Sequence, residues 1–154
     1  LKLNKTWKLK YTIKKKYIDD KEHIFDPVRK KYLVNTPEEW IRQNFIHYLH
    51  TKKSFPLSLM STEKLTIINN QNTRSDIVCY NNLGKPILVV ECKSEKINLN
   101  NNVFNQVQNY NSILKAKYVI ITNGKTTLCF YINEKHVDLL KKIPDFSQIK
   151  NSKD

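Results

Sequence analysis

The segment that most constrains the fold spans residues 74–93 and has the pattern of a β-hairpin. Residues 76–80 are rich in β-branched and aromatic side chains, Asn-Asn-Leu-Gly-Lys at 81–85 supplies a turn, and 86–93 is a nearly continuous apolar run. A strand that is apolar on both sides is usually covered on both sides. The chain is therefore predicted to build its core around this hairpin.

Charged side chains stand at the ends of the two predicted strands. Asp76 opens the first strand, and Glu91 and Lys93 close the second. Because side chains alternate along a strand, Glu91 and Lys93 are expected on one face and Cys92 on the other. A charge at the rim of a core needs a partner. The alternative is that Glu91 and Lys93 form a solvent-exposed ion pair at the end of the strand, without a functional role.

Length and cysteine content indicate one reduced domain. A chain of 154 residues can bury a core without disulfides or structural metals. Its three cysteines, Cys79, Cys92 and Cys129, are an odd number without a close pair, so they are interpreted as reduced core residues of a cytoplasmic protein. Neither a long apolar run nor a signal-peptide pattern is present, so membrane insertion and export are not expected.

The formal charge of +13 favours a polyanionic partner. Only three of the 27 basic residues are arginines, at 29, 42 and 74. Lys, Asn and Ile are all abundant, as in proteins from AT-rich genomes, so part of the basicity has a codon-bias explanation. Charge alone thus supports a nucleic-acid partner without establishing one.

The first thirty-odd residues are predicted to form a basic β appendage. Residues 7–14 alternate apolar with polar side chains, and a polar turn follows at 19–21. Residues 24–25 and 31–34 continue as one or two further strands, with Asp26-Pro27 as the break between them. Its lysines have two interpretations. They either guard the edges of a solvated sheet or bind phosphates.

A helix is predicted from Thr36 to about His50. Thr36 is the expected N-cap, Pro37 stands in the first turn, and Glu39 is placed to complete a capping box. Glu39 shares a flank of this helix with Arg42 and Gln43, so a role outside capping stays open. His47 and His50 are three residues apart but have no further ligand at metal-binding spacing, and they are interpreted as surface residues.

The rest of the chain is predicted to alternate strands with one helix. This helix, over 102–114, places Gln106 and Tyr110 one turn apart. The tail beyond Pro144 is expected to fray. The remaining predictions are a strand at 63–68, a polar turn at 69–73, strands at 118–122 and 126–132, and a tight turn at 123–124 between the last two.

These elements carry a set of residues at particular places. They are Asp76, the Glu-Cys-Lys tripeptide at 91–93, the pair Gln106 and Tyr110, and the flanking phrases at 25–31, 36–40 and 122–124. In them the chain resembles the PD-(D/E)xK nuclease superfamily, and more closely the family named for the N-terminal domain of the type I restriction enzyme R subunit, in its small stand-alone form. The resemblance covers nearly the whole chain. Ser75 departs from the proline of the superfamily name, at a position that varies widely.

The resemblance implies an α/β (α+β) fold with a restriction-endonuclease-like core. A mixed central sheet would be flanked by helices in the order α-β-β-β-α-β, with an N-terminal β appendage. The chain would be one nuclease-like domain, in which 1–34 form the appendage, 35–132 the core and 133–154 a C-terminal extension.

The resemblance also implies a site for Mg²⁺, with Mn²⁺ as a substitute. Asp76 and Glu91 would be carboxylate ligands, and the backbone carbonyl of Cys92 a third ligand, in line with the preference of Mg²⁺ for oxygen. Lys93 would orient or deprotonate the attacking water and offset phosphate charge. Glu39 would be an accessory acid, with Glu38 as the fallback.

Three further residues receive roles by the same resemblance. Gln106 would steady the site or touch phosphate, and Tyr110 would support it from the helix. Arg74 would contact DNA together with Lys93 and Gln106.

The function expected from these features is Mg²⁺-dependent cleavage of DNA, as an endonuclease of restriction or DNA-processing type. Two other classes stay open. One is a non-catalytic DNA-binding module, and the other is a nuclease subunit that needs separate motor or specificity subunits. A homodimer is left open, and no membrane partner is expected. The sequence offers no evident element for reading bases directly.

Overall fold

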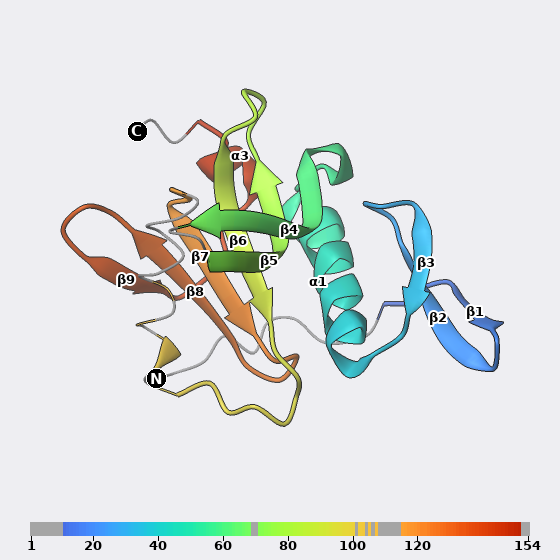
Figure 1. Ribbon diagram of the computed structural model, residues 1–154. Coiled ribbons are helices and arrows are strands. Elements are labelled where there is room, and N and C mark those ends of the chain that lie inside the picture. The colour runs from blue at the N-terminus through green and yellow to red at the C-terminus, as the bar shows by residue number, and fades with distance from the viewer. Residues whose placement is uncertain are drawn as a thin grey trace.

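The computed structural model describes residues 11–68, 71–100, 102, 103, 105, 107 and 115–151, with the backbone alone at 64–68 and 71–74. Its centre is a six-stranded sheet in sequence order, in which only β6 and β7 run parallel and all other neighbours are antiparallel (Figure 1). The mixed sheet confirms the predicted fold class. The strands are β4 (Met60–Ile68), β5 (Gln71–Tyr80), β6 (Pro86–Cys92), β7 (Tyr118–Thr122), β8 (Thr127–Ile132) and β9 (Val137–Leu140).

Both faces of this sheet are covered, as the apolar run of β6 requires. On one face the helix α1 (Pro37–Lys53) packs Ile41, Phe45 and Leu49 against the strands. On the other face Val103 and Val107 pack against residues of β7 and β8. The predicted helix over 102–114 lies largely outside the described residues. Burial on both faces places the core around β6 and β7.

A second, three-stranded sheet lies on the side of α1 away from the large sheet (Figure 1). It consists of the antiparallel strands β1 (Lys15–Ile18), β2 (Lys21–Asp26) and β3 (Lys31–Val34). Ile24 and Asp26 of the central strand are fully buried. The predicted N-terminal β appendage is thus a packed sheet that holds α1 from its outer side.

Helix α1 begins where the sequence predicted. Thr36 has extended backbone angles, and its Oγ1 accepts a hydrogen bond from the Glu39 N–H at 3.1 Å, as expected for an N-cap. Pro37 stands in the first turn. The helix continues to Lys53, three residues beyond the prediction, and Ser54 ends it in the left-handed region at φ 60°. This start fixes where Glu39 and Arg42 lie one turn further on.

Three local predictions were wrong. Of the strand predicted over 7–14, residues 7–10 lie outside the described residues and 11–14 form no strand. In that segment Tyr11 stacks on His47 and Ile13 is buried. The turn predicted over 69–73 is shorter, since β5 begins at Gln71 and pairs with Ile68. Asp76 therefore lies inside β5, at its sixth residue, and does not open it.

The third error concerns the C-terminal segment. The short helix α3 (Phe146–Ile149) follows β9 and carries a capping box formed by Asp145 and Gln148. Ile149 is 1% exposed and packs in the same core cluster as α1. Residues 145–151 are ordered because apolar side chains such as Ile149 complete the α1 side of the core, and 152–154 lie outside the described residues. A 3₁₀ turn at Leu57–Leu59 follows α1.

The cysteines agree with the prediction of reduced core residues. Cys79, Cys92 and Cys129 are all free and buried. Burial raises the pKa of each thiol, that of Cys129 to about 12, so all three stay protonated at neutral pH. Among the described helices, none is both long and apolar enough to cross a membrane.

Candidate functional site

The candidate site lies where β5 and β6 stop pairing with each other. The last register pair between these strands is Ile77 with Val90. Beyond it, β5 continues beside β4 and β6 continues beside β7. Asp76 and Glu91 are the next residues of the two strands beyond this pair. We call this opening, formed by Asp76, Glu91 and Cys92, the hairpin fork.

Asp76 fills the hairpin fork with its carboxylate. Its Oδ2 accepts a hydrogen bond from the backbone N–H of Cys92 at 2.7 Å, and its Oδ1 accepts one from an Arg42 amino group at 2.8 Å. The first contact gives the Cys92 N–H an acceptor where the strands have parted. The second ties β5 to α1. Both Asp76 oxygens are therefore engaged by donors.

Glu91 and Lys93 form the other side of the hairpin fork. The Lys93 ammonium pairs with Glu91 Oε1, whereas Glu91 Oε2 is buried and has no hydrogen-bond partner among the described residues. Glu91 is only 7% exposed. The Cys92 side chain packs in the core cluster that contains α1, as strand alternation leads one to expect. Among the described residues, the buried Oε2 of Glu91 is thus an acceptor that no donor uses.

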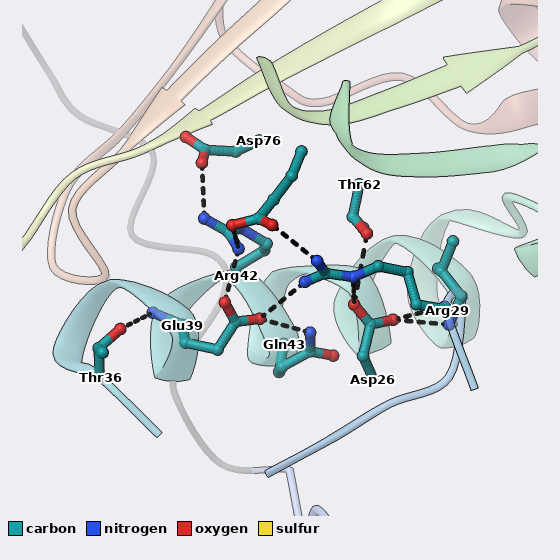
Figure 2. A network of polar contacts seen from close by, with 10 residues as sticks. Asp26, Arg29, Thr36, Glu39, Arg42, Gln43, Thr62 and Asp76 are labelled. Atoms are coloured by element: carbon teal, nitrogen blue, oxygen red, sulfur yellow. Dashed lines mark hydrogen bonds and ion pairs between the residues drawn. The ribbon is translucent and has the colours of Figure 1, made fainter. Parts of the chain in front are cut away.

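A dense group of ion pairs joins α1 to the two sheets beside the fork (Figure 2). At its centre, Arg42 donates from one amino group to Glu39 at 2.6 Å and to Glu63 at 3.0 Å, and from the other to Asp76. Arg42 is 5% exposed. One guanidinium therefore binds carboxylates from a helix and two strands. We call the whole group the arginine cluster; it consists of Asp26, Arg29, Glu39, Arg42, Glu63 and Asp76.

Arg29 extends the arginine cluster to the small sheet. Its Nε donates to Asp26 Oδ2 at 2.8 Å, and one of its amino groups donates to Glu63 at 2.7 Å. The other Asp26 oxygen accepts the backbone N–H groups of Val28 and Arg29 in the turn after β2. Asp26 thus shapes the turn that carries Arg29 and fixes the side chain of that same arginine.

Glu63 reaches both arginines through an unusual backbone conformation. Its φ is 52°, in the left-handed region that non-glycine residues rarely adopt. Thr62 pairs with Ile77 and Lys64 with Ser75, so Glu63 lies opposite Asp76. Thr62 and Glu63 are consecutive, yet Thr62 Oγ1 donates to Asp26 and Glu63 accepts from Arg29. The left-handed residue breaks the usual alternation of faces, a kind of strain that clusters at functional sites.

The charges of the arginine cluster keep both arginines ionised. Burial alone would lower the pKa of Arg42, but the carboxylates of Glu39 and Asp76 outweigh it and raise that pKa. The pKa of Arg29 is raised in the same way by Asp26 and Glu63. Both arginines therefore keep their positive charge across the physiological pH range.

A cavity of about 340 Å³ opens beside the arginine cluster. Glu39 and Arg42 from α1, Glu63 from β4 and Asp76 from β5 line it. Its outer wall includes Leu33 and Val34 at the end of β3, together with Arg29, Thr36 and the exposed Glu38. Asp76 is therefore reachable from solvent along a path bordered by the small sheet.

The predicted site residues are distributed as follows. Asp76 bonds to the backbone N–H of Cys92, the residue after Glu91, while Lys93 pairs with Glu91, and Arg42 links Glu39 to Asp76. The Glu39 carboxylate bonds to Arg42 and Gln43, so it does more than cap the helix. The positions of three predicted site residues cannot be compared with the structure. Gln106 and Tyr110 lie outside the described residues, and so does the side chain of Arg74.

Sequence reasoning missed Asp26, Arg29 and Glu63 as members of the site. One signal was present, because Arg29 and Arg42 are two of only three arginines in a lysine-rich chain. Arginine presents a planar fork of donors that suits several carboxylates at once, and lysine does not. For Glu63 no local pattern indicated a left-handed residue inside a strand.

The residues of the hairpin fork fit a divalent cation in a sparse way. Among the described residues, no three His, Cys, Asp or Glu side chains are grouped so as to hold a metal ion. Mg²⁺ does not need three, since it is usually held by one or two carboxylates, water and substrate phosphate. The buried, unpartnered Glu91 Oε2 is an acceptor that such an ion would satisfy.

Comparison with known proteins gives one family and one related fold. The family model described as type I restriction enzyme R protein N terminus matches residues 37–144. The fragment structure of a protein assigned as the HsdR subunit of a type I restriction enzyme from Vibrio vulnificus YJ016 is similar in fold, with a TM-score of 0.58 at 18% identity. The match covers 74% of this chain and 24% of that one, so this chain spans about a quarter of its solved relative. No curated protein sequence matches.

Proposed function

The chain belongs to the family of the type I restriction enzyme R protein N terminus, and from this membership we propose that it cleaves DNA phosphodiesters with a bound Mg²⁺ ion. The reaction is that of an endonuclease of restriction or DNA-processing type. The observation that carries the proposal is the hairpin fork, where Asp76 and Glu91 follow the last β5–β6 register pair, Asp76 bonds to the Cys92 N–H, and Glu91 Oε2 has no partner among the described residues.

Asp76, Glu91 and the carbonyl of Cys92 would hold the cation, with Mn²⁺ as a substitute. A bound divalent ion polarises phosphate and makes water a better nucleophile at neutral pH. The two carboxylates of the hairpin fork differ in their hydrogen bonds. Asp76 accepts from donors on both oxygens, whereas Glu91 has one oxygen without a partner among the described residues. The fork thus combines a rigid ligand with an available one.

Lys93 would act on the attacking water. Its ammonium lies against Glu91 and is about a quarter exposed, so substrate and solvent can reach it. A lysine in this place can hold the water by a hydrogen bond, take up its proton, or offset the charge that develops on phosphate. Glu39 acts one step back, because Arg42 stands between it and Asp76. Arg74, Gln106 and Tyr110 keep the DNA-contacting and supporting roles that the resemblance implies.

Two observations favour other functions. Both Asp76 oxygens are already engaged, and Arg42 supplies positive charge where a cation would otherwise be needed, which suits a non-catalytic DNA-binding module. The chain also spans only 24% of the HsdR relative. Membership of the R-subunit family itself suits a nuclease part that works with motor or specificity subunits.

The test compares cleavage by the wild-type chain, Lys93→Ala and a matched control, Lys96→Ala, which removes an exposed lysine three residues away. Plasmid DNA and single-stranded DNA are incubated with Mg²⁺ or Mn²⁺. Lys93→Ala is expected to lose about 10²- to 10⁴-fold in rate, because it removes the group that handles the proton. Unfolding and DNA affinity should change little. Full cleavage by Lys93→Ala contradicts the mechanism, and a wild-type chain inactive under all these conditions favours the two alternatives.

A further inference from the structure

The small sheet has two chemically different faces. Strand register places Lys15, Ile24 and Leu33 in one row, and Lys16, His23 and Val34 in the next. Neighbouring rows point to opposite faces of a sheet. The Lys15 row faces α1, since Ile24 is fully buried and the Lys15 ammonium lies 4.6 Å from the centre of the Trp40 ring. The Lys16 row therefore faces outward.

The carboxylates of these strands are confined to the inner face. Glu22 accepts from Lys15 and from Asn35, and Asp26 is buried in the arginine cluster. The outer face consists of Lys16, Ile18, Lys21, His23, Phe25, Tyr32 and Val34 by the same register and carries no acidic side chain. Exposed carboxylates stand beyond both ends of this face: Asp19 and Asp20 in the turn between β1 and β2, and Glu38 beside Val34 in the cavity wall. The outer face itself thus carries the ammonium groups of Lys16 and Lys21 and no opposing charge.

Aromatic side chains hold one of these lysines in place. The Lys16 ammonium lies 4.0 Å from the centre of the Tyr32 ring, and Tyr32 packs against Phe25 with ring centroids 5.2 Å apart. Such a contact restrains a flexible lysine at little cost to its charge. Lys16 therefore presents its ammonium from a fixed position.

Protection of sheet edges does not account for this face. Edge lysines discourage pairing with another chain, and the edges here are β1 and β3. Lys21 and His23 belong to the central strand, which has no free edge. The face also continues into the candidate site, because Val34 lies on it and lines the cavity that reaches Asp76.

We propose that the outer face of the β1–β2–β3 sheet binds the sugar-phosphate backbone of DNA and leads it toward the cavity at Asp76. Lys16 and Lys21 contact phosphates. Val34 lies where the bound DNA strand passes from the small sheet to the candidate site. The inference rests on the proposed function only in naming DNA as the polyanion. Contacts to phosphate carry no sequence information, so binding here is independent of base sequence.

The test measures binding of a short fluorescein-labelled DNA duplex by anisotropy, in EDTA so that no cleavage occurs. The double variant Lys16→Gln/Lys21→Gln is compared with Lys15→Gln/Lys31→Gln, which removes the same charge from the inner-face rows of the same sheet. Each phosphate contact contributes about 0.9 to the slope of log affinity against log salt. The outer-face variant should lower that slope by about 2 and weaken binding roughly tenfold or more at low salt. The inner-face variant should change affinity far less.

Three outcomes would overturn the inference. They are wild-type affinity in the outer-face variant, equal losses in both variants, and wild-type binding that does not depend on salt. Thermal unfolding of both variants checks that the sheet remains folded. Failure here is distinct from failure of the proposed function, which is judged by cleavage with Mg²⁺ and by Lys93→Ala.

Discussion

The three carboxylates around Arg42 and the single carboxylate of Glu91 are hydrogen-bonded in different ways. Glu39, Glu63 and Asp76 surround Arg42, and each accepts a hydrogen bond from it. Glu91 pairs with Lys93 through one oxygen and keeps the other buried without a partner among the described residues. The first three carboxylates are all held by a shared arginine, whereas one oxygen of Glu91 is not held by any described residue.

The difference distinguishes carboxylates that hold the fold together from a carboxylate that can bind a ligand. A paired buried ion contributes little net stability compared with an apolar core, but removing one partner is costly because the other charge stays buried. The arginine cluster therefore locks α1 to both sheets. A buried acceptor without a partner, in contrast, indicates either strain or a ligand. Glu91 is where a ligand would gain the most.

The largest expected effect comes from emptying the centre of the arginine cluster. Arg42→Met should lower the free energy of unfolding by about 3–5 kcal/mol, because three carboxylates lose their common partner while they remain buried or half-buried. Denaturant unfolding measures the change. Lys52→Met, an exposed substitution in the last turn of the same helix, is the control and should stay within about 0.5 kcal/mol of wild type. A loss below about 1 kcal/mol for Arg42→Met would mean that the cluster does not hold the elements together.

A smaller effect distinguishes the two carboxylates of the hairpin fork. Asp76→Asn weakens charge-assisted bonds from Arg42 and from the Cys92 N–H, and should cost about 1.5–3 kcal/mol of unfolding free energy. Glu91→Gln loses only its partly exposed pair with Lys93 and should cost less than about 1 kcal/mol.

Both variants should nevertheless lose Mn²⁺ binding measured by calorimetry, because each removes a proposed ligand. Equal destabilisation by the two substitutions would erase the distinction between a satisfied and an available carboxylate. Retained Mn²⁺ binding in Glu91→Gln would remove Glu91 from the proposed site.

The sequence predicted those parts of the fold that depend on local pattern. Alternation and the apolar run fixed β6 and the opposite orientations of Glu91 and Cys92, and the cap at Thr36 fixed the start of α1. These features follow from strand periodicity and helix capping, which act over a few residues. The hairpin at the centre of the fold could therefore be predicted from the sequence alone.

The arginine cluster was not accessible in the same way, because its members are far apart in the chain. Arg29 and Glu63 are 34 residues apart, as are Arg42 and Asp76. Their meeting depends on the small sheet packing on α1 and on a left-handed residue inside β4. The helix-start pattern predicted that the Glu39 side chain would complete a capping box. In the structure its carboxylate accepts a hydrogen bond from Arg42 instead. Gln106 and Tyr110 stay predictions.

The smallest expected effect tests whether the helix cap or the arginine cluster positions Glu39. Thr36→Ala removes the acceptor for the Glu39 N–H and should cost about 1 kcal/mol of unfolding free energy, whereas Thr36→Ser keeps that acceptor and should cost less. The Glu39 side chain is held separately, by Arg42 at 2.6 Å and Gln43 at 2.8 Å. Cleavage by Thr36→Ala should therefore stay near the wild-type rate at temperatures where the variant is folded. A marked fall in cleavage with so small a loss of stability would mean that the start of α1 aims Glu39, and that the arginine cluster serves stability alone.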